Sequence, residues 1–277
     1  MEVRYTTDAQ HFKRMTTEEV RAMFLIDTLF QPDTIPLVYA DVDRSITGSA
    51  VPVTQSLELL AITKEMAAEY FTQRREIGVI NIGEQGSIIV EGTEYAMAHK
   101  DALYIGKGSK KIVFKSTDMA TPAKFYFVSY PAHKEYPATH AKFSDAEPTN
   151  FGSVKDANQR TIYKYIHPKG IPSCQLVMGL TMLNEGSVWN TMPVHTHQRR
   201  SEIYMYFGLP ENALVFHLLG EPSETRHIVV KNQQAVLSTS WSIHSGVATQ
   251  AYTFIWAMGG ENQVFDDMDW VPMEILR

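Results

Sequence analysis

The sequence predicts an all-β fold with a few short helices, arranged as a duplicated β-barrel. Short runs of β-branched and aromatic residues, separated by glycine or polar turns, recur along most of the 277-residue chain. Many short strands at close spacing are typical of a sandwich or barrel. Three segments of the first half also have counterparts in the second half, in the same order.

The N-terminal region is expected to be helical. Thr16 and Glu19 fit a capping box in front of the apolar residues Val20, Met23 and Phe24. A second short helix is expected over residues 64–71. We expect the N-terminal helix to be an appendage to the barrels.

The expected strands form two series. The first is GVINIG, GSIIVEG, DALYIG, KIVFKS and AKFYFVSY. The second is CQLVMGLTML, EIYMYF, NALVFHLL, RHIVVKN, QAVLS and AYTFIWAM. Each run is rich in residues that favour strands and ends at a turn signal.

The two halves resemble each other. The run from Arg74 to Ile77 is similar to that from Arg199 to Ile203, the segment from Asp101 to that from Gln234, and AKFYFVSY to AYTFIWAM. The offset is roughly 125 to 135 residues, which is a domain-sized repeat. We therefore predict an N-terminal barrel at residues 1–150 and a C-terminal barrel at 151–277, with the boundary near 145–155.

Composition excludes several classes of protein. A single cysteine rules out an internal disulfide and a thiolate zinc cluster within one chain, so any metal must use His, Asp or Glu. The net charge of -6 argues against nucleic-acid binding. No apolar run approaches the roughly 20 residues of a membrane helix. The first residues, MEVRYTTDAQ, lack the apolar core of a signal peptide, so a cytoplasmic location is expected.

The stretch MPVHTHQRRSE contains the candidate metal ligands. His195 and His197 would project from the same face of a strand, because residues i and i+2 do so. A bend through residues 198–201 would return Glu202 to that face at the start of a neighbouring strand. His244, at the end of a later strand, would complete a set that suits Zn, Fe, Mn or Ni. The alternative interpretation is that these histidines are solvated or belong to the core.

The first half has no equivalent set. It lacks a histidine pair before Arg74 and has no histidine where the second half has His244. Glu76 alone cannot hold a zinc ion. We therefore expect one metal ion per chain, in residues 151–277.

The histidine pair, the later glutamate and the strand-end histidine, in a duplicated β-rich chain, resemble the metal signature of bicupins. A narrower family is similar along nearly the whole chain, on the segments NIGEQGSIIVEG, ALYIGKGSKKIVF, TPAKFYF, VWNTMPVHTHQRR, ETRHIVV, SWSIHSG and YTFIWAMGGENQVFDDMD. These resemble 5-dehydro-4-deoxy-D-glucuronate isomerase, also called 4-deoxy-L-threo-5-hexosulose-uronate ketol-isomerase.

This resemblance implies the double-stranded β-helix of cupins and a ketol-isomerase of pectin and uronate breakdown. It implies zinc held by His195, His197, Glu202 and His244, a small uronate substrate and a homo-oligomer, expected to be a hexamer. The reaction would move a carbonyl from C1 to C2, by an enediol or a hydride shift. Two alternatives stay open: an Fe(II)-dependent cupin dioxygenase and a non-catalytic sugar-binding bicupin.

The catalytic base and the substrate-binding cation are not fixed by spacing. The candidates for the base, or for orienting substrate, are Glu261, Tyr204 and Tyr206. A substrate carboxylate would need a cation, for which an arginine fork has the best geometry. The candidates are Arg199, Arg200, Arg160 and Lys164.

Overall fold

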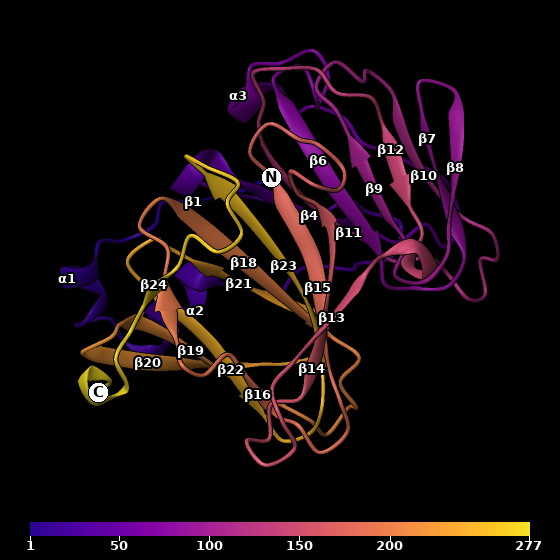
Figure 1. The fold of residues 1–277 in the computed structure, drawn as a ribbon. Coiled ribbons are helices and arrows are strands. Elements are labelled where there is room, and N and C mark those ends of the chain that lie inside the picture. Colours follow the sequence, from indigo (N-terminus) through magenta and orange to yellow (C-terminus); the bar gives the residue numbers. More distant parts are fainter. The chain divides into compact units, whose positions relative to one another are not determined.

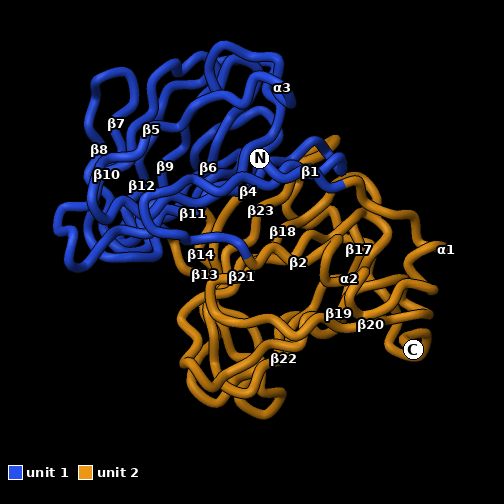
Figure 2. The backbone as a smooth tube through the Cα atoms, turned by 180° about the vertical axis from the view of Figure 1, so that it is seen from behind, with its two compact units in different colours: residues 1–4, 28–146, 165–177 blue, residues 5–27, 147–164, 178–277 orange.

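The computed structural model describes residues 1–277 and consists mainly of β-strands (Figure 1). No helix in it is both long and apolar enough to cross a membrane. The chain forms two compact units, coloured separately in Figure 2. The predicted all-β class with a few short helices is confirmed.

The first unit contains residues 1–4, 28–146 and 165–177. One of its sheets has seven strands, in the order β1 (Glu2–Arg4), β3 (Leu37–Ala40), β4 (Ile46–Ala50), β11 (Phe125–Pro131), β6 (Arg75–Asn81), β9 (Ala102–Ile105) and β12 (Thr139–Ala141). The other has four, in the order β5 (Leu57–Glu58), β10 (Ile112–Ser116), β7 (Gly86–Val90) and β8 (Thr93–Met97).

The second unit contains residues 5–27, 147–164 and 178–277. Its seven-stranded sheet has the order β13 (Pro148–Phe151), β14 (Arg160–Ile166), β15 (Val177–Leu183), β23 (Thr253–Gly260), β18 (Arg200–Phe207), β21 (Gln234–Ser238) and β2 (Leu25–Ile26). The four-stranded sheet has the order β16 (Trp189–Asn190), β22 (Ile243–Ala248), β19 (Val215–Glu221) and β20 (Glu224–Val230). A short pair joins β17 (His195–Thr196) to β24 (Asp269–Trp270).

The sheet orders show the duplication. The series β4-β11-β6-β9 of the first unit has the same arrangement as β15-β23-β18-β21 of the second, and β5-β10-β7-β8 matches β16-β22-β19-β20. The change of unit at residues 146/147 falls within the predicted boundary region. The units do not match the predicted division into residues 1–150 and 151–277. Residues 5–27 belong to the second unit, and residues 165–177 belong to the first.

Glu76 explains why residues 165–177 belong to the first unit. Its buried carboxylate accepts the backbone N–H groups of Cys174, Gln175 and Leu176 at 2.7, 2.8 and 2.9 Å. It also accepts the Tyr104 hydroxyl at 2.8 Å. These four bonds tie a distant segment to β6 and satisfy a buried charge.

The predicted capping box is present at α2 (Thr17–Phe24), between Thr16 and Glu19. The helix predicted over residues 64–71 is wrong in extent. There, α3 covers only Thr63–Met66, since Ala67 adopts a left-handed conformation with φ of 46° and ends it. The other helices are α1 (Ala9–Phe12) and the 3₁₀ turns Val42–Arg44, Phe143–Asp145 and Met273–Ile275.

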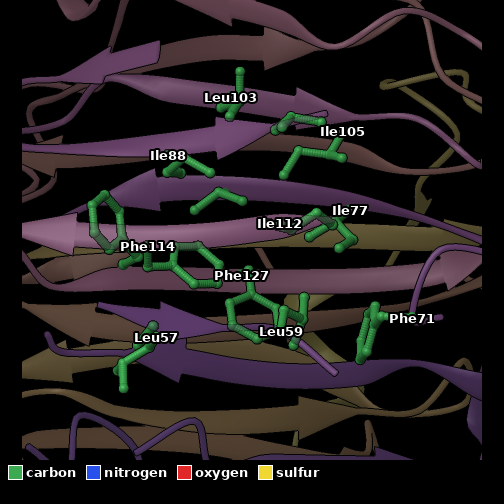
Figure 3. Packing of buried hydrophobic residues seen from close by; sticks show 14 of the residues in the cluster. Leu57, Leu59, Phe71, Ile77, Ile88, Leu103, Ile105, Ile112, Phe114 and Phe127 are labelled. Carbon is green, nitrogen blue, oxygen red and sulfur yellow. The ribbon is translucent and has the colours of Figure 1, made fainter. Parts of the chain in front are cut away.

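The interior of the first barrel is filled with apolar side chains (Figure 3). Ile77 is the third residue of β6, between Ile105 of β9 and Ser129 of β11. Glu202 has the matching place in β18, between Ser238 of β21 and Met258 of β23. Hence the first barrel carries an isoleucine where the second carries a carboxylate, and Glu76 points away from that interior.

Candidate functional site

The four predicted ligands come together inside the second unit. His195, His197, Glu202 and His244 are all buried, and one donor atom from each lies within 4.8 Å of the others. It is the only such group of His, Cys, Asp and Glu in residues 1–277. Three strands supply them. His195 lies in β17 and His197 directly follows it, while Glu202 lies in β18 and His244 in β22.

Local geometry explains how distant residues reach one centre. The chain turns at residues 198–199 between β17 and β18, so the expected bend is present and Glu202 returns to the histidines. His244 is the second residue of β22, which corrects its expected place at the end of a strand. It is paired with Leu219 in the middle of the four-stranded sheet, which fixes the direction of its side chain.

The donor atom of each of the four residues lies at a hydrogen-bond distance from at least one of the others. Glu202 Oε2 lies 3.0 Å from His197 Nε2 and 2.9 Å from His244 Nε2. His244 Nε2 lies 3.0 Å from His195 Nε2. His197 Nδ1 lies 2.9 Å from the carbonyl oxygen of Asp267, and a proton on Nδ1 leaves the lone pair of Nε2 directed at the centre. This donor set fits a divalent metal ion.

Electrostatics favour the unprotonated ligands. Burial lowers the pKa of His195 to about 2, and the charges of His244 and His197 add to the effect. Burial alone would raise the pKa of Glu202, but attraction to His244 and hydrogen bonds with His197 and His244 outweigh it and lower the pKa. Metal ligands must be neutral imidazole and carboxylate, so both directions suit metal binding.

A cavity of about 180 Å³ opens beside this centre. Its walls are largely apolar, with a few polar groups, as is usual for small-molecule sites. It is lined by Phe151, Arg160, Ile162, Thr181, Asn190, Thr191, His195, His197, Glu202, Tyr204, Phe254, Trp256, Met258, Phe265, Asp266, Met268 and Trp270.

Among the predicted cations, only Arg160 lines the cavity. It donates to the carbonyl of Asn158 at 2.9 Å and to the Thr191 hydroxyl at 3.3 Å, while its buried Nε has no partner. No carboxylate pairs with it. Burial lowers its pKa, which reflects this lack of a counter-charge.

The other three predicted cations are engaged elsewhere. Arg199 pairs with Asp267 and Asp269, whose carboxylates also raise its pKa through hydrogen bonds. Buried Arg200 donates to backbone carbonyls, those of Val264, Phe265 and Asp267. The Lys164 ammonium lies 3.7 Å from the centre of a phenylalanine ring. Arg199 and Arg200 therefore hold the loop 261–268.

The predicted bases have three different surroundings. Tyr204 lines the cavity and hydrogen-bonds to Asn190, and burial raises its pKa well above the usual value. Tyr206 lies away from the cavity, with its hydroxyl 2.7 Å from Nδ1 of buried His217. Glu261 is exposed and does not line the cavity, so its position does not support the predicted role.

Asp266 is a residue that the sequence interpretation missed. Besides Glu202, it is the one acidic residue among those that line the cavity, and it is exposed. Its neighbours are fixed, because Arg200 binds the carbonyls of Phe265 and Asp267, and Arg199 binds the Asp267 side chain. The acidic run FDDMD was a signal, but it does not say which acid faces the cavity.

Comparison with known proteins identifies the family. Residues 39–273 match the model of the KduI/IolB family. The chain belongs to the KduI/IolB family. Proteins named 4-deoxy-L-threo-5-hexosulose-uronate ketol-isomerase align with all of this chain over their own full lengths. That from Caldicellulosiruptor bescii is 54% identical, that from Lachnoclostridium phytofermentans 55% and that from Escherichia coli 50%. The predicted family and the isomerase class are confirmed.

Solved structures agree with the fold. An IolB-like protein from Salmonella typhimurium has a TM-score of 0.67 at 13% identity, covering 82% of this chain and 87% of its own. Oxalate decarboxylase from Bacillus subtilis, which has Mn(II) centres, has a TM-score of 0.56 at 8% identity, covering 80% of this KduI/IolB chain and 70% of its own. At such low identity these likenesses concern the fold alone, and they agree with the predicted duplicated cupin barrel.

Proposed function

We propose that this protein is a zinc-dependent isomerase that converts 5-dehydro-4-deoxy-D-glucuronate to 3-deoxy-D-glycero-2,5-hexodiulosonate, in pectin and uronate breakdown. One observation carries the proposal. A buried three-histidine, one-carboxylate group opens on a cavity with an unpaired arginine, in a chain 50–55% identical over its full length to named ketol-isomerases. His195, His197, Glu202 and His244 would hold one zinc ion.

The cavity residues supply the binding chemistry. Arg160 would bind the substrate carboxylate, because its guanidinium has an unpartnered Nε and no acid of its own. Tyr204 keeps its proton at neutral pH, since burial raises its pKa, and so would donate a hydrogen bond to a substrate oxygen. The aromatic and methionine walls would keep water from the reacting carbons. When bound, zinc would act as a Lewis acid toward the carbonyl and the adjacent hydroxyl.

We assign the proton transfer to Asp266. Its carboxylate would take the C2 proton, and the electrons of the C2–H bond would form a C1=C2 double bond as the C1 oxygen gains a proton. The proton would then return from Asp266 to C1. The C2 hydroxyl would give up one proton, which balances the proton gained by the C1 oxygen, and become the carbonyl. Reactant and product have the same atoms and electrons, so no oxidant is needed.

The test is turnover of the uronate, followed by NMR without oxygen and combined with metal analysis of the same sample. We expect conversion to the 2-ketose in the absence of oxygen. Oxygen-dependent consumption of the uronate would indicate a dioxygenase, and no turnover at all would indicate a sugar-binding protein.

We also propose a cytoplasmic homo-oligomer, expected to be a hexamer. The mass of the native particle would test the oligomeric state.

A further inference from the structure

A second polar cavity lies in the first unit, in the barrel without candidate metal ligands. Its volume is about 260 Å³, against about 180 Å³ for the cavity beside the metal ligands. Three arginines line it, together with one glutamate and several apolar groups. The polar lining residues are Tyr39, Arg44, Glu65, Arg74 and Arg75.

Arg75 is a buried cation without an acidic partner. It is 8% exposed, and it donates to the Ser129 hydroxyl at 3.0 Å, the Ser129 carbonyl at 2.8 Å and the Arg44 carbonyl at 2.5 Å. None of these acceptors carries a charge. Burial lowers the pKa of Arg75 to about 10, in line with a charge that lacks compensation.

The matching arginine of the second unit has different surroundings. Arg200 is the first residue of β18, as Arg75 is of β6, and both donate to backbone carbonyls. The charges of Glu202, Asp267 and Asp266 act favourably on Arg200. No acid acts in this way on Arg75. A buried charge without compensation is expensive, so an anionic group beside Arg75 would stabilise this barrel.

Glu65 indicates which class of anion could bind beside Arg75. It lines the same cavity, and its Oε2 atom is buried without a hydrogen-bond partner. A carboxylate repels a simple anion but accepts hydrogen bonds from hydroxyl groups. We propose that this cavity binds a small polyhydroxy carboxylate, such as a sugar acid, with its carboxylate at Arg75 and Arg44 and its hydroxyls at Glu65.

Arg74 contributes to the wall of this site. Its Nη1 donates to the carbonyl of Ala67 at 2.8 Å, which holds the residues after α3 against the cavity. Arg44 is exposed and makes no such bond, so it can be replaced without loss of a structural contact. The site lies wholly within the first unit and does not depend on the metal centre or on the proposed isomerase activity.

The test uses sodium D-gluconate, which has a carboxylate and hydroxyls but no carbonyl to isomerise. The background is the full-length, metal-loaded Arg160→Gln protein, which lacks the arginine that would bind a carboxylate in the other cavity. Calorimetric titrations would compare this protein with three variants of it, which carry Arg44→Gln, Glu65→Gln or Lys110→Gln in addition. Lys110 is an exposed cation outside the cavity and serves as the control for charge. Sorbitol, the uncharged analogue, tests the need for the carboxylate.

We expect Arg44→Gln and Glu65→Gln each to weaken gluconate binding about tenfold, and Lys110→Gln to leave it unchanged. Sorbitol should not bind measurably. The proposal is overturned if gluconate gives no binding up to about 10 mM. It is equally overturned if Arg44→Gln binds gluconate as well as Lys110→Gln does.

Discussion

The Nε2 atoms of His195 and His244 lie 3.0 Å apart, although 49 positions separate the two residues in the sequence. One comes from β17 and the other from β22, in a different sheet. Two imidazole nitrogens at this distance cannot both carry protons without repulsion. With Glu202 Oε2 beside them, they form a set of lone pairs directed at one point, which a cation would stabilise.

Replacement of Asp266 tests the assignment of the base. Asp266→Asn should lower kcat about 100-fold or more, because general-base catalysis contributes at least that much, while leaving bound metal unchanged. Glu261→Gln is the matched control, since Glu261 is exposed on the same loop but does not line the cavity. Steady-state kinetics with metal analysis would check this. If Glu261→Gln shows the larger loss, the base lies outside the cavity lining.

Replacement of Arg160 tests carboxylate binding. Arg160→Gln should raise KM about tenfold or more, because the cavity then lacks its only guanidinium fork. Lys164→Gln should change KM by less than about twofold, since this ammonium lies against the Phe265 ring. Equal effects of the two substitutions on KM would argue for general electrostatic attraction in place of a specific contact.

Local patterns predicted the parts of this molecule that local chemistry determines. The capping box at Thr16 and the bend that returns Glu202 to the histidines both follow from short stretches of sequence. Long-range contacts decided the rest. Asp266 reaches the cavity because arginines some 65 residues earlier hold its loop, by contacts such as that of Arg200 with the Phe265 carbonyl. Glu76 and Ile77 are adjacent, and only the strand pairing shows that Ile77 has the place of Glu202.

The proposed role of Asp266 predicts that hydrogen moves from C2 to C1 as a proton and not as a hydride. If Asp266 carries the proton from C2 to C1, the reaction in ²H₂O should place deuterium at C1 of the product, because a carboxylic acid exchanges its proton with solvent. A hydride shift would keep the original hydrogen. Proton NMR of the product after one turnover in ²H₂O distinguishes the routes, and complete retention of ¹H would contradict the role given to Asp266.

Buried His217 should make stability depend on pH. Burial lowers its pKa to about 3, so between about pH 3 and 6.5 the unfolded chain binds a proton that the folded chain does not. Stability is therefore lost as pH falls below about 6.5, by roughly 2 kcal/mol at pH 5 from this residue. Urea unfolding of metal-free protein at pH 7 and pH 5 would measure it. His217→Phe should reduce the difference by that amount, and an unchanged difference would show that His217 does not contribute.

The most direct test of the central claim is a zinc titration of metal-free protein, with turnover of the uronate measured at each addition. Turnover should rise in proportion to zinc and stop rising at one ion per chain, because only the second unit brings four ligands together. The His195→Ala, His197→Ala double variant should stay folded, bind little zinc and remain inactive. Activity that reaches its maximum only at two ions per chain, or full zinc binding by the double variant, would contradict the account.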